Sequence, residues 1–107
     1  MRFYSFSFGE MTVSEGDPQR PQTIATQVNL GFRESETTPV QTVTLRIRAP
    51  HDPSKTFQAT EDEAFRMAGE LLRAAAEYCE GRDWRQLAEE TRANKSVVFT
   101  PSHTPSN

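Results

Sequence analysis

The sequence predicts an α+β fold in which an antiparallel sheet of about four or five strands has two helices packed on one face. Segments 23–32 and 40–49 alternate apolar and polar residues with a period of two, which is typical of strands. Segment 60–81 instead has the spacing of an amphipathic helix. The chain of 107 residues has the length of one domain. We therefore expect one domain over residues 1–100 and a disordered tail over residues 101–107.

The first strand is predicted over residues 2–8, where aromatic residues alternate with serine. A period of two places Tyr4, Phe6 and Phe8 on one face of this strand. A loop is predicted over residues 14–22, because this segment combines glycine, aspartate, two prolines and charges.

The next two segments are predicted to form a hairpin with one face in water. In segment 23–32, one face is made of Ile24, Thr26, Val28, Leu30 and Phe32. In segment 40–49, the apolar face is made of Val43, Leu45, Ile47 and Ala49, and the polar face of Thr42, Thr44, Arg46 and Arg48. The short connection between the segments favours antiparallel pairing. Two further short strands are predicted over residues 55–59 and 96–101.

The predicted long helix is the most regular stretch of the sequence. Thr60 and Glu63 form the pattern of a capping box at its start, and Gly81 is placed to end it. Four charged residues of alternating sign fall in one narrow arc that we expect to face solvent: Arg66, Glu70, Arg73 and Glu77. The apolar arc is wide enough to need a second cover besides the sheet, and we expect Phe65, Leu72 and the alanines in the core.

A second, shorter helix is predicted to supply that cover. Asp83 is a suitable N-cap for a helix that starts at Trp84, with Gln86 at the third position. The residues that share its apolar face are Trp84, Leu87, Ala88 and Thr91. We expect this helix to fold back on the first one.

The long helix also carries a resemblance to known proteins. It has the pattern Thr-x-x-Glu-Ala-x-x-x-Ala-x-x-Leu-Leu-x-Ala-Ala, formed by Thr60, Glu63, Ala64, Ala68, Leu71, Leu72, Ala74 and Ala75. In this pattern the chain resembles the C-terminal helix of small uncharacterised proteins from actinobacteria and their phages. The match covers about 20 of the 107 residues. The resemblance implies no known activity, and it suggests an origin in a phage or mobile element.

Charge and cysteine content narrow the classes of function. The net charge is −3, and the acidic excess lies in residues 60–95, which carry nine acidic and six basic residues. This balance argues against a basic nucleic-acid-binding protein. The single cysteine, Cys79, permits no internal disulfide and favours a reducing compartment. Because the sequence has no signal-peptide pattern and no apolar run of membrane length, we expect a soluble, cytoplasmic protein with no membrane partner.

No residue pattern indicates catalysis, a metal or a cofactor. Cys79 lies on the apolar arc near the C-terminal end of the long helix, where we expect a buried, unreactive thiol. The positions of His51 and His103 fit no zinc-site spacing, and the acidic run 61–63 is explained by the first turn of a helix. A glycine-rich phosphate loop and the common hydrolase motifs are missing from the sequence. We expect a protein that is not an enzyme and has no cofactor.

The outer face of the sheet is the candidate binding surface. The residues predicted to form it are Arg46, Arg48, Thr44, Gln27, Asn29 and Phe3. Two arginines suit a partner protein with an acidic patch, because guanidinium groups bind carboxylates bidentately. A single aromatic residue is too few for an RNA-stacking platform. A plain solvated face is the alternative interpretation of the same residues.

The sequence therefore favours a non-enzymatic module that binds another protein, such as a small phage or mobile-element inhibitor of the anti-defence type. One alternative is a structural or assembly subunit that self-associates, for example as a homodimer, through a strand edge or the apolar arc of the helix. Another is an enzyme whose site the sequence does not reveal.

Overall fold

The computed structural model has an α+β fold and describes the backbone of residues 1–102 and the side chains of residues 1–95. Its elements are β1 (Arg2–Val13), β2 (Thr23–Arg33), β3 (Gln41–Pro50), α1 (Phe57–Cys79) and α2 (Trp84–Ser102). The chain divides within α1 into two compact units, Met1–Leu71 and Leu72–Asn107, and each is described by itself. The expected single domain over residues 1–100 stays a prediction. The expected tail lies outside the described residues from position 103 onward.

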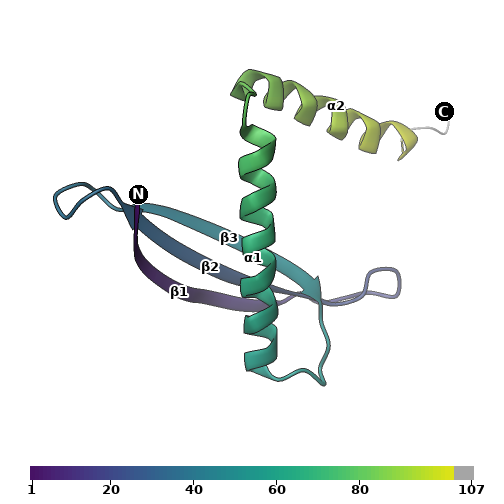
Figure 1. The fold of residues 1–107 in the computed structure, drawn as a ribbon. Helices are drawn as coiled ribbons and strands as arrows, with labels where there is room; N and C mark the ends of the chain where they lie inside the picture. The colour runs from purple at the N-terminus through teal and green to yellow at the C-terminus, as the bar shows by residue number, and fades with distance from the viewer. Residues whose placement is uncertain (103–107) are drawn as a thin grey trace. The chain divides into compact units, whose positions relative to one another are not determined.

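The sheet consists of three antiparallel strands in the order β1-β2-β3 (Figure 1). The predicted hairpin is confirmed, because β2 and β3 pair in unbroken register, with Val28 opposite Leu45 and Gln27 opposite Arg46. The pairing brings apolar positions of both strands to one face and polar positions to the other. One face of the sheet therefore has a core to bury, and the other has side chains suited to water.

The described residues form three strands, which does not confirm the expected four or five. Segment 55–59 runs into α1, because the Thr56 hydroxyl accepts the backbone N–H of Ala59 at 3.0 Å and caps the helix there. Segment 96–101 continues α2. No glycine or proline lies between Trp84 and Thr100, so a helix that has started gains one hydrogen bond for each added residue.

A bulge in β1 changes the face on which its first residues lie. Phe3 pairs with Phe32, and Ser5 pairs with Gly31, which leaves Tyr4 as an extra residue in the ladder. Phe3 therefore lies on the face of Phe32, and the two rings meet edge to face with centroids 5.9 Å apart. The expected position of Phe3 on the outer face is wrong, because strict alternation does not hold across a bulge.

Strict alternation predicted Tyr4 on the same face as Phe6 and Phe8. This prediction is wrong, because the bulge moves Tyr4 to the other face. The guanidinium carbon of Arg33 lies 4.4 Å from the centre of the Tyr4 ring. Phe8 instead packs against the core on the opposite face. A second irregularity in β1 lies between Phe8 and Met11.

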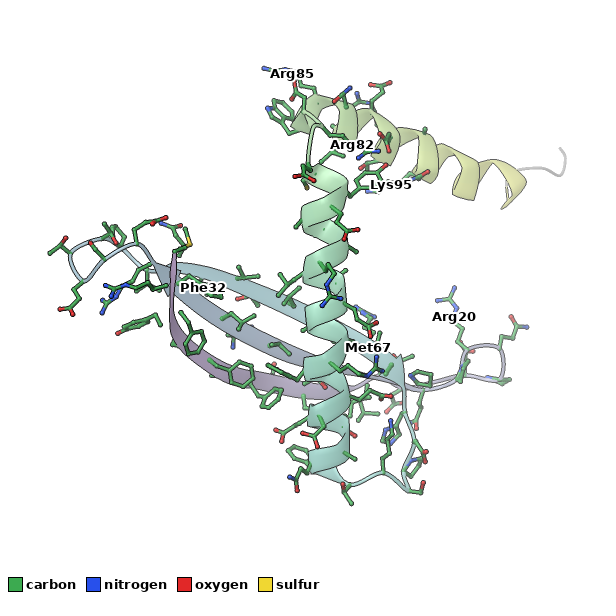
Figure 2. All side chains as sticks on the ribbon, viewed as in Figure 1. Arg20, Phe32, Met67, Arg82, Arg85 and Lys95 are labelled. Carbon is green, nitrogen blue, oxygen red and sulfur yellow. The ribbon has the colours of Figure 1, made fainter. Side chains whose placement is uncertain are left out.

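The core lies where α1 crosses the apolar face of the sheet (Figure 1). Its buried cluster consists of Val28, Ile47, Ala64 and Ala68, and Phe8, Leu30, Leu45 and Met67 pack around it. Figure 2 labels Met67 on the part of α1 that crosses the sheet. The two alanines lie one turn apart, and their small side chains let the helix backbone come close to the strands.

The rest of the predicted apolar arc of α1 is not buried. Ala64 and Ala68 are the buried residues of this helix, whereas Phe65 is 54% exposed. Leu72 is half-buried, and the alanines at 74–76 are exposed. The expectation that Phe65 and all the alanines belong to the core is wrong, because one three-stranded sheet covers only a narrow stripe of a helix.

The charged arc of α1 is exposed, as predicted. Arg66 and Glu70 form an ion pair at 2.6 Å across one turn. The predicted capping box is wrong, because the helix begins at Phe57 and Glu63 instead accepts a hydrogen bond from Lys55 Nζ at 2.6 Å. That hydrogen bond and the lysine charge lower the pKa of the Glu63 carboxyl.

The second unit contains the C-terminal part of α1 and the whole of α2. The predicted end of α1 is confirmed by Gly81, whose φ of +75° favours glycine. The predicted cap of α2 is also confirmed, because the Asp83 carboxylate accepts the N–H of Arg85 at 3.0 Å and the Asp83 N–H donates to Gln86 Oε1 at 2.8 Å. Trp84, expected to face the first helix, is 68% exposed.

A hydrogen bond within this second unit joins its two helices. The Tyr78 hydroxyl of α1 donates to the Glu90 carboxylate of α2. This hydrogen bond raises the pKa of Tyr78 above its ordinary value, because an ionised phenol could no longer donate to the carboxylate.

Candidate binding surfaces

Beside α1, the apolar face of the sheet has a hollow walled by aromatic rings. Its volume is about 530 Å³, and its lining residues are Phe3, Phe6, Phe8, Leu30, Asp62 and Phe65. Phe3 is 62% exposed, Phe65 54% and Phe6 38%. We call these three rings, with Phe8 and Leu30, the aromatic surface. Asp62 is the one charged residue that lines the hollow, and no ion pair of the described residues involves it.

The rings of the aromatic surface pack against one another edge to face. The centroid of Phe6 lies 5.0 Å from that of Phe8 and 5.4 Å from that of Phe65, with interplanar angles of 83° and 85°. Such pairs contribute about 0.5–1.5 kcal/mol each beyond the area they bury. Phe6 therefore joins β1 to α1, and the rings of the hollow support one another while parts of their faces remain in water.

The rings are exposed because the strands are longer than one helix is wide. β2 has 11 residues and is about 36 Å long, whereas a helix is about 10 Å across. Since α1 runs across the strands (Figure 1), it covers their middle, at Val28, and leaves the start of β1 partly open. Phe32, labelled in Figure 2, lies at the end of β2 and is half-buried there.

The sequence contained one signal for this surface. The apolar arc of the long helix is wider than a single sheet can bury, and Phe65 belongs to the part of the arc that the sheet does not cover. Nothing in the sequence indicated that Phe3 and Phe6 lie on the same face, because this depends on the bulge at Tyr4. The sequence predicts Asp62 in an acidic first turn, which is wrong, because the helix begins at Phe57 and Asp62 lines the hollow.

The outer face of the sheet brings together five of the six residues predicted to bind a partner. Gln27 is opposite Arg46, Asn29 is opposite Thr44, and Arg48 is opposite Ala25. Phe3 is the exception, because it lies on the apolar face.

Hydrogen bonds occupy the amide and hydroxyl groups of the outer face. The hydroxyl of Thr44 donates to Asn29 Oδ1 at 3.1 Å, and Gln27 Nε2 donates to the same atom at 3.4 Å. Asn29 Nδ2 donates to Ser7 Oγ at 3.3 Å. This polar ladder ties the three strands together, so Gln27 and Asn29 have a structural role. Arg46, Arg48 and Thr44 are exposed on this face, whereas Gln27 and Asn29 are half-buried.

A second bulge in β1 adds an acidic residue to this outer face. A hollow of about 180 Å³ is lined by Glu10, Thr12, Ala25, Gln27, Thr44 and Arg46. Gly9 lies at the bulge, where an added Cβ atom would clash with the side chain of Gln27. The signal in the sequence was an isolated glycine inside a strand pattern, which is typical of a bulge.

The side chains considered for catalysis are exposed or take part in local turns. Cys79 is exposed, so its predicted burial is wrong; the end of α1 has no sheet face against it within its own unit. The Asp52 carboxylate accepts hydrogen bonds from the hydroxyl and N–H of Ser54, which lower its pKa and form a turn next to His51. Within the described part of the chain, no three metal-ligating side chains gather in one place.

The chain was compared with protein-family models, with curated proteins and with solved structures, and none of the three comparisons found a match. Among the described residues, the helices lack the combination of length and apolar character that crossing a bilayer requires.

Proposed function

We propose that this chain is a non-enzymatic protein-binding module that contacts its partner through the aromatic surface. The observation that carries the proposal is the exposure of Phe3, Phe6 and Phe65 around one hollow. Taking about 200 Å² for a whole phenylalanine side chain, the three rings present about 300 Å² of apolar area to water. The largest apolar patch of a typical monomer covers about 300–600 Å² and is often functional.

The lining of the hollow defines the partner's chemistry. Aromatic walls and Leu30 accept one or two apolar side chains, and aromatic residues are enriched at the centres of protein interfaces. The Asp62 carboxylate stands at the same hollow and suits a lysine or arginine of the partner. The partner segment therefore combines an apolar anchor with a basic residue.

The wider role that we propose is that of a small cytoplasmic inhibitor encoded by a phage or mobile element, of the anti-defence type. Support for this role comes from the helix pattern that begins at Thr60.

The test is a titration of a purified partner, first identified by capture on the immobilised chain. Phe65→Asp should weaken binding tenfold or more, because it places a charge among the rings of the hollow. Gln58→Asp is the matched control, since Gln58 is an exposed residue of the same helix and does not line the hollow. This control should bind like the wild type.

Two results would overturn the proposal. One is equal affinity of the wild type and Phe65→Asp for the purified partner. The other is a dimer of the wild type in a sizing experiment that becomes a monomer in Phe65→Asp, because the aromatic surface would then bind a second copy of the chain.

A further inference from the structure

The two edges of the sheet are not alike. β1 has register shifts between Phe3 and Ser5 and between Phe8 and Met11. β3 pairs with β2 without any shift, from Thr23↔Pro50 to Phe32↔Gln41. Bulges disrupt the row of backbone donors and acceptors that an edge strand offers, so β1 is protected against further pairing and β3 is not. No strand among the described residues pairs with the second edge of β3.

The outer side of this open edge carries two arginines, and the acidic residue of the same face, Glu10, belongs to β1 at the other edge of the sheet. Arg46 and Arg48 are exposed, as are Thr42 and Thr44 before them. The two arginines are two residues apart, about 7 Å along the strand, which is the spacing of alternate side chains on an added strand. Carboxylates at alternate positions of that strand would each meet one guanidinium group.

The inner side of the same edge combines apolar residues with one carboxylate, Glu70, which forms an ion pair with Arg66. A hollow of about 330 Å³ lies between β3 and α1, and its lining residues are Arg46, Ile47, Arg48, Met67, Glu70 and Leu71. Leu71 is 47% exposed and lines the same hollow as the core residue Ile47. An added strand would place its inward side chains over this hollow, where apolar residues cover Leu71 and Met67.

We propose that β3 accepts an extended segment of another protein as a fourth strand, and that this segment alternates acidic and apolar residues. Main-chain hydrogen bonds to the open edge hold the segment. Its acidic side chains meet Arg46 and Arg48 on the outer face, and its apolar side chains enter the hollow beside Leu71. This site is separate from the aromatic surface, whose rings come from β1 and from Phe65 of α1.

Charge argues against a second copy of the chain as the occupant. In a dimer, the β3 strands of two copies would pair antiparallel across a two-fold axis. If the axis passes Ile47, the hollows of both copies are covered. In that register Arg46 of each copy lies opposite Arg48 of the other, so four guanidinium groups gather on one face. Like charges directly opposite each other destabilise a strand pair.

The test uses a capped synthetic peptide of alternating glutamate and valine, titrated into the full chain and followed by amide hydrogen exchange. Binding should slow exchange along β3 and leave β1 unchanged. A peptide of the same composition with the glutamates and valines in two blocks is the control for the strand period, and it should bind at least tenfold more weakly. Equal binding of the two peptides would overturn the proposal, because attraction by net charge alone would explain it.

A charge exchange tests the role of the arginines. The double variant Arg46→Glu, Arg48→Glu should bind the glutamate–valine peptide at least tenfold more weakly than the wild type does. It should bind a lysine–valine peptide better than the wild type does, which also shows that the variant is folded. The proposal is wrong if the double variant keeps its affinity for the glutamate–valine peptide, or if no peptide binding is detected up to millimolar concentration.

Two further measurements separate this site from the alternatives. Phe65→Asp should bind the glutamate–valine peptide as the wild type does, because Phe65 lies outside this hollow. A loss of peptide binding in this variant would place the peptide on the aromatic surface and overturn the proposal. The proposal would also be overturned if sizing showed that the free chain is a dimer and if, without peptide, the amides of β3 were already protected from hydrogen exchange.

Discussion

Val28→Ala is the substitution that most directly tests the packing of α1 on the sheet. Val28 is fully buried at the centre of the core, where it clusters with Ile47, Ala64 and Ala68. The change removes two methyl groups, worth about 1.6 kcal/mol at about 0.8 kcal/mol for each buried carbon. The cavity left behind adds about 1 kcal/mol if the neighbours do not collapse into it. We therefore expect a loss of about 2–3 kcal/mol in the free energy of unfolding.

This loss is large for a chain of 107 residues, whose total stability is expected at roughly 5–15 kcal/mol. The midpoint of thermal unfolding should fall by about 8–24 °C, at 4–8 °C per kcal/mol. Urea denaturation followed by circular dichroism measures the free energy directly, provided that the slope with denaturant is the same for both proteins.

Val13→Ala is the matched control, because it makes the same chemical change at the end of β1, where the side chain is 44% exposed. Its loss should stay below about 1 kcal/mol, since part of the valine is already in water. Equal losses for the two substitutions would refute the position of the core between Val28 and α1.

Three more predictions concern single residues. Gly69→Ala should raise the free energy of unfolding by about 0.5–1 kcal/mol in a urea melt, because Gly69 lies inside α1 and an added Cβ meets no atom within 4 Å; a lower melting point would contradict this. Cys79 should react with a thiol reagent in the folded protein at the rate of a free cysteine, and reaction only after unfolding would show that it is covered. The hydrogen bond and charge of Lys55 lower the pKa of Glu63 below its ordinary 4.5. The pair therefore stabilises the folded protein above about pH 4.5, and this stabilisation is lost as the pH falls through the pKa of the folded state. In Lys55→Gln, a carboxyl NMR titration should show the Glu63 midpoint moving up toward 4.5, and an unchanged midpoint would exclude the pair.

The sequence alone determined the features that depend on neighbouring residues. The hairpin of β2 and β3 follows from two alternating segments, whose pattern permits only one face to be buried. The cap at Asp83 and the end of α1 at Gly81 are local as well, because each depends on hydrogen bonds or backbone angles within a few residues.

Where two local signals competed, the prediction was wrong. Thr56 and Thr60 both offer a hydroxyl for the start of α1, and the structure uses Thr56, which lengthens the helix and removes the predicted strand at 55–59. Segment 96–101 is rich in β-branched and aromatic residues, yet it continues α2. Strand propensity depends on packing against a paired strand, and the unit that contains this segment has no strand among its described residues.

Tertiary structure alone decided which apolar side chains are covered. Periodicity shows that Phe65 shares an arc with Ala64 and Ala68, but only the crossing of α1 over the sheet shows that the alanines are buried and that Phe65 stands at the rim of an open hollow. The bulge at Tyr4 moves Phe3 to the same hollow. A bulge depends on pairing with another strand, and burial depends on the area that a neighbouring element can cover. Neither property belongs to a segment by itself, so the aromatic surface could be located only in the folded chain.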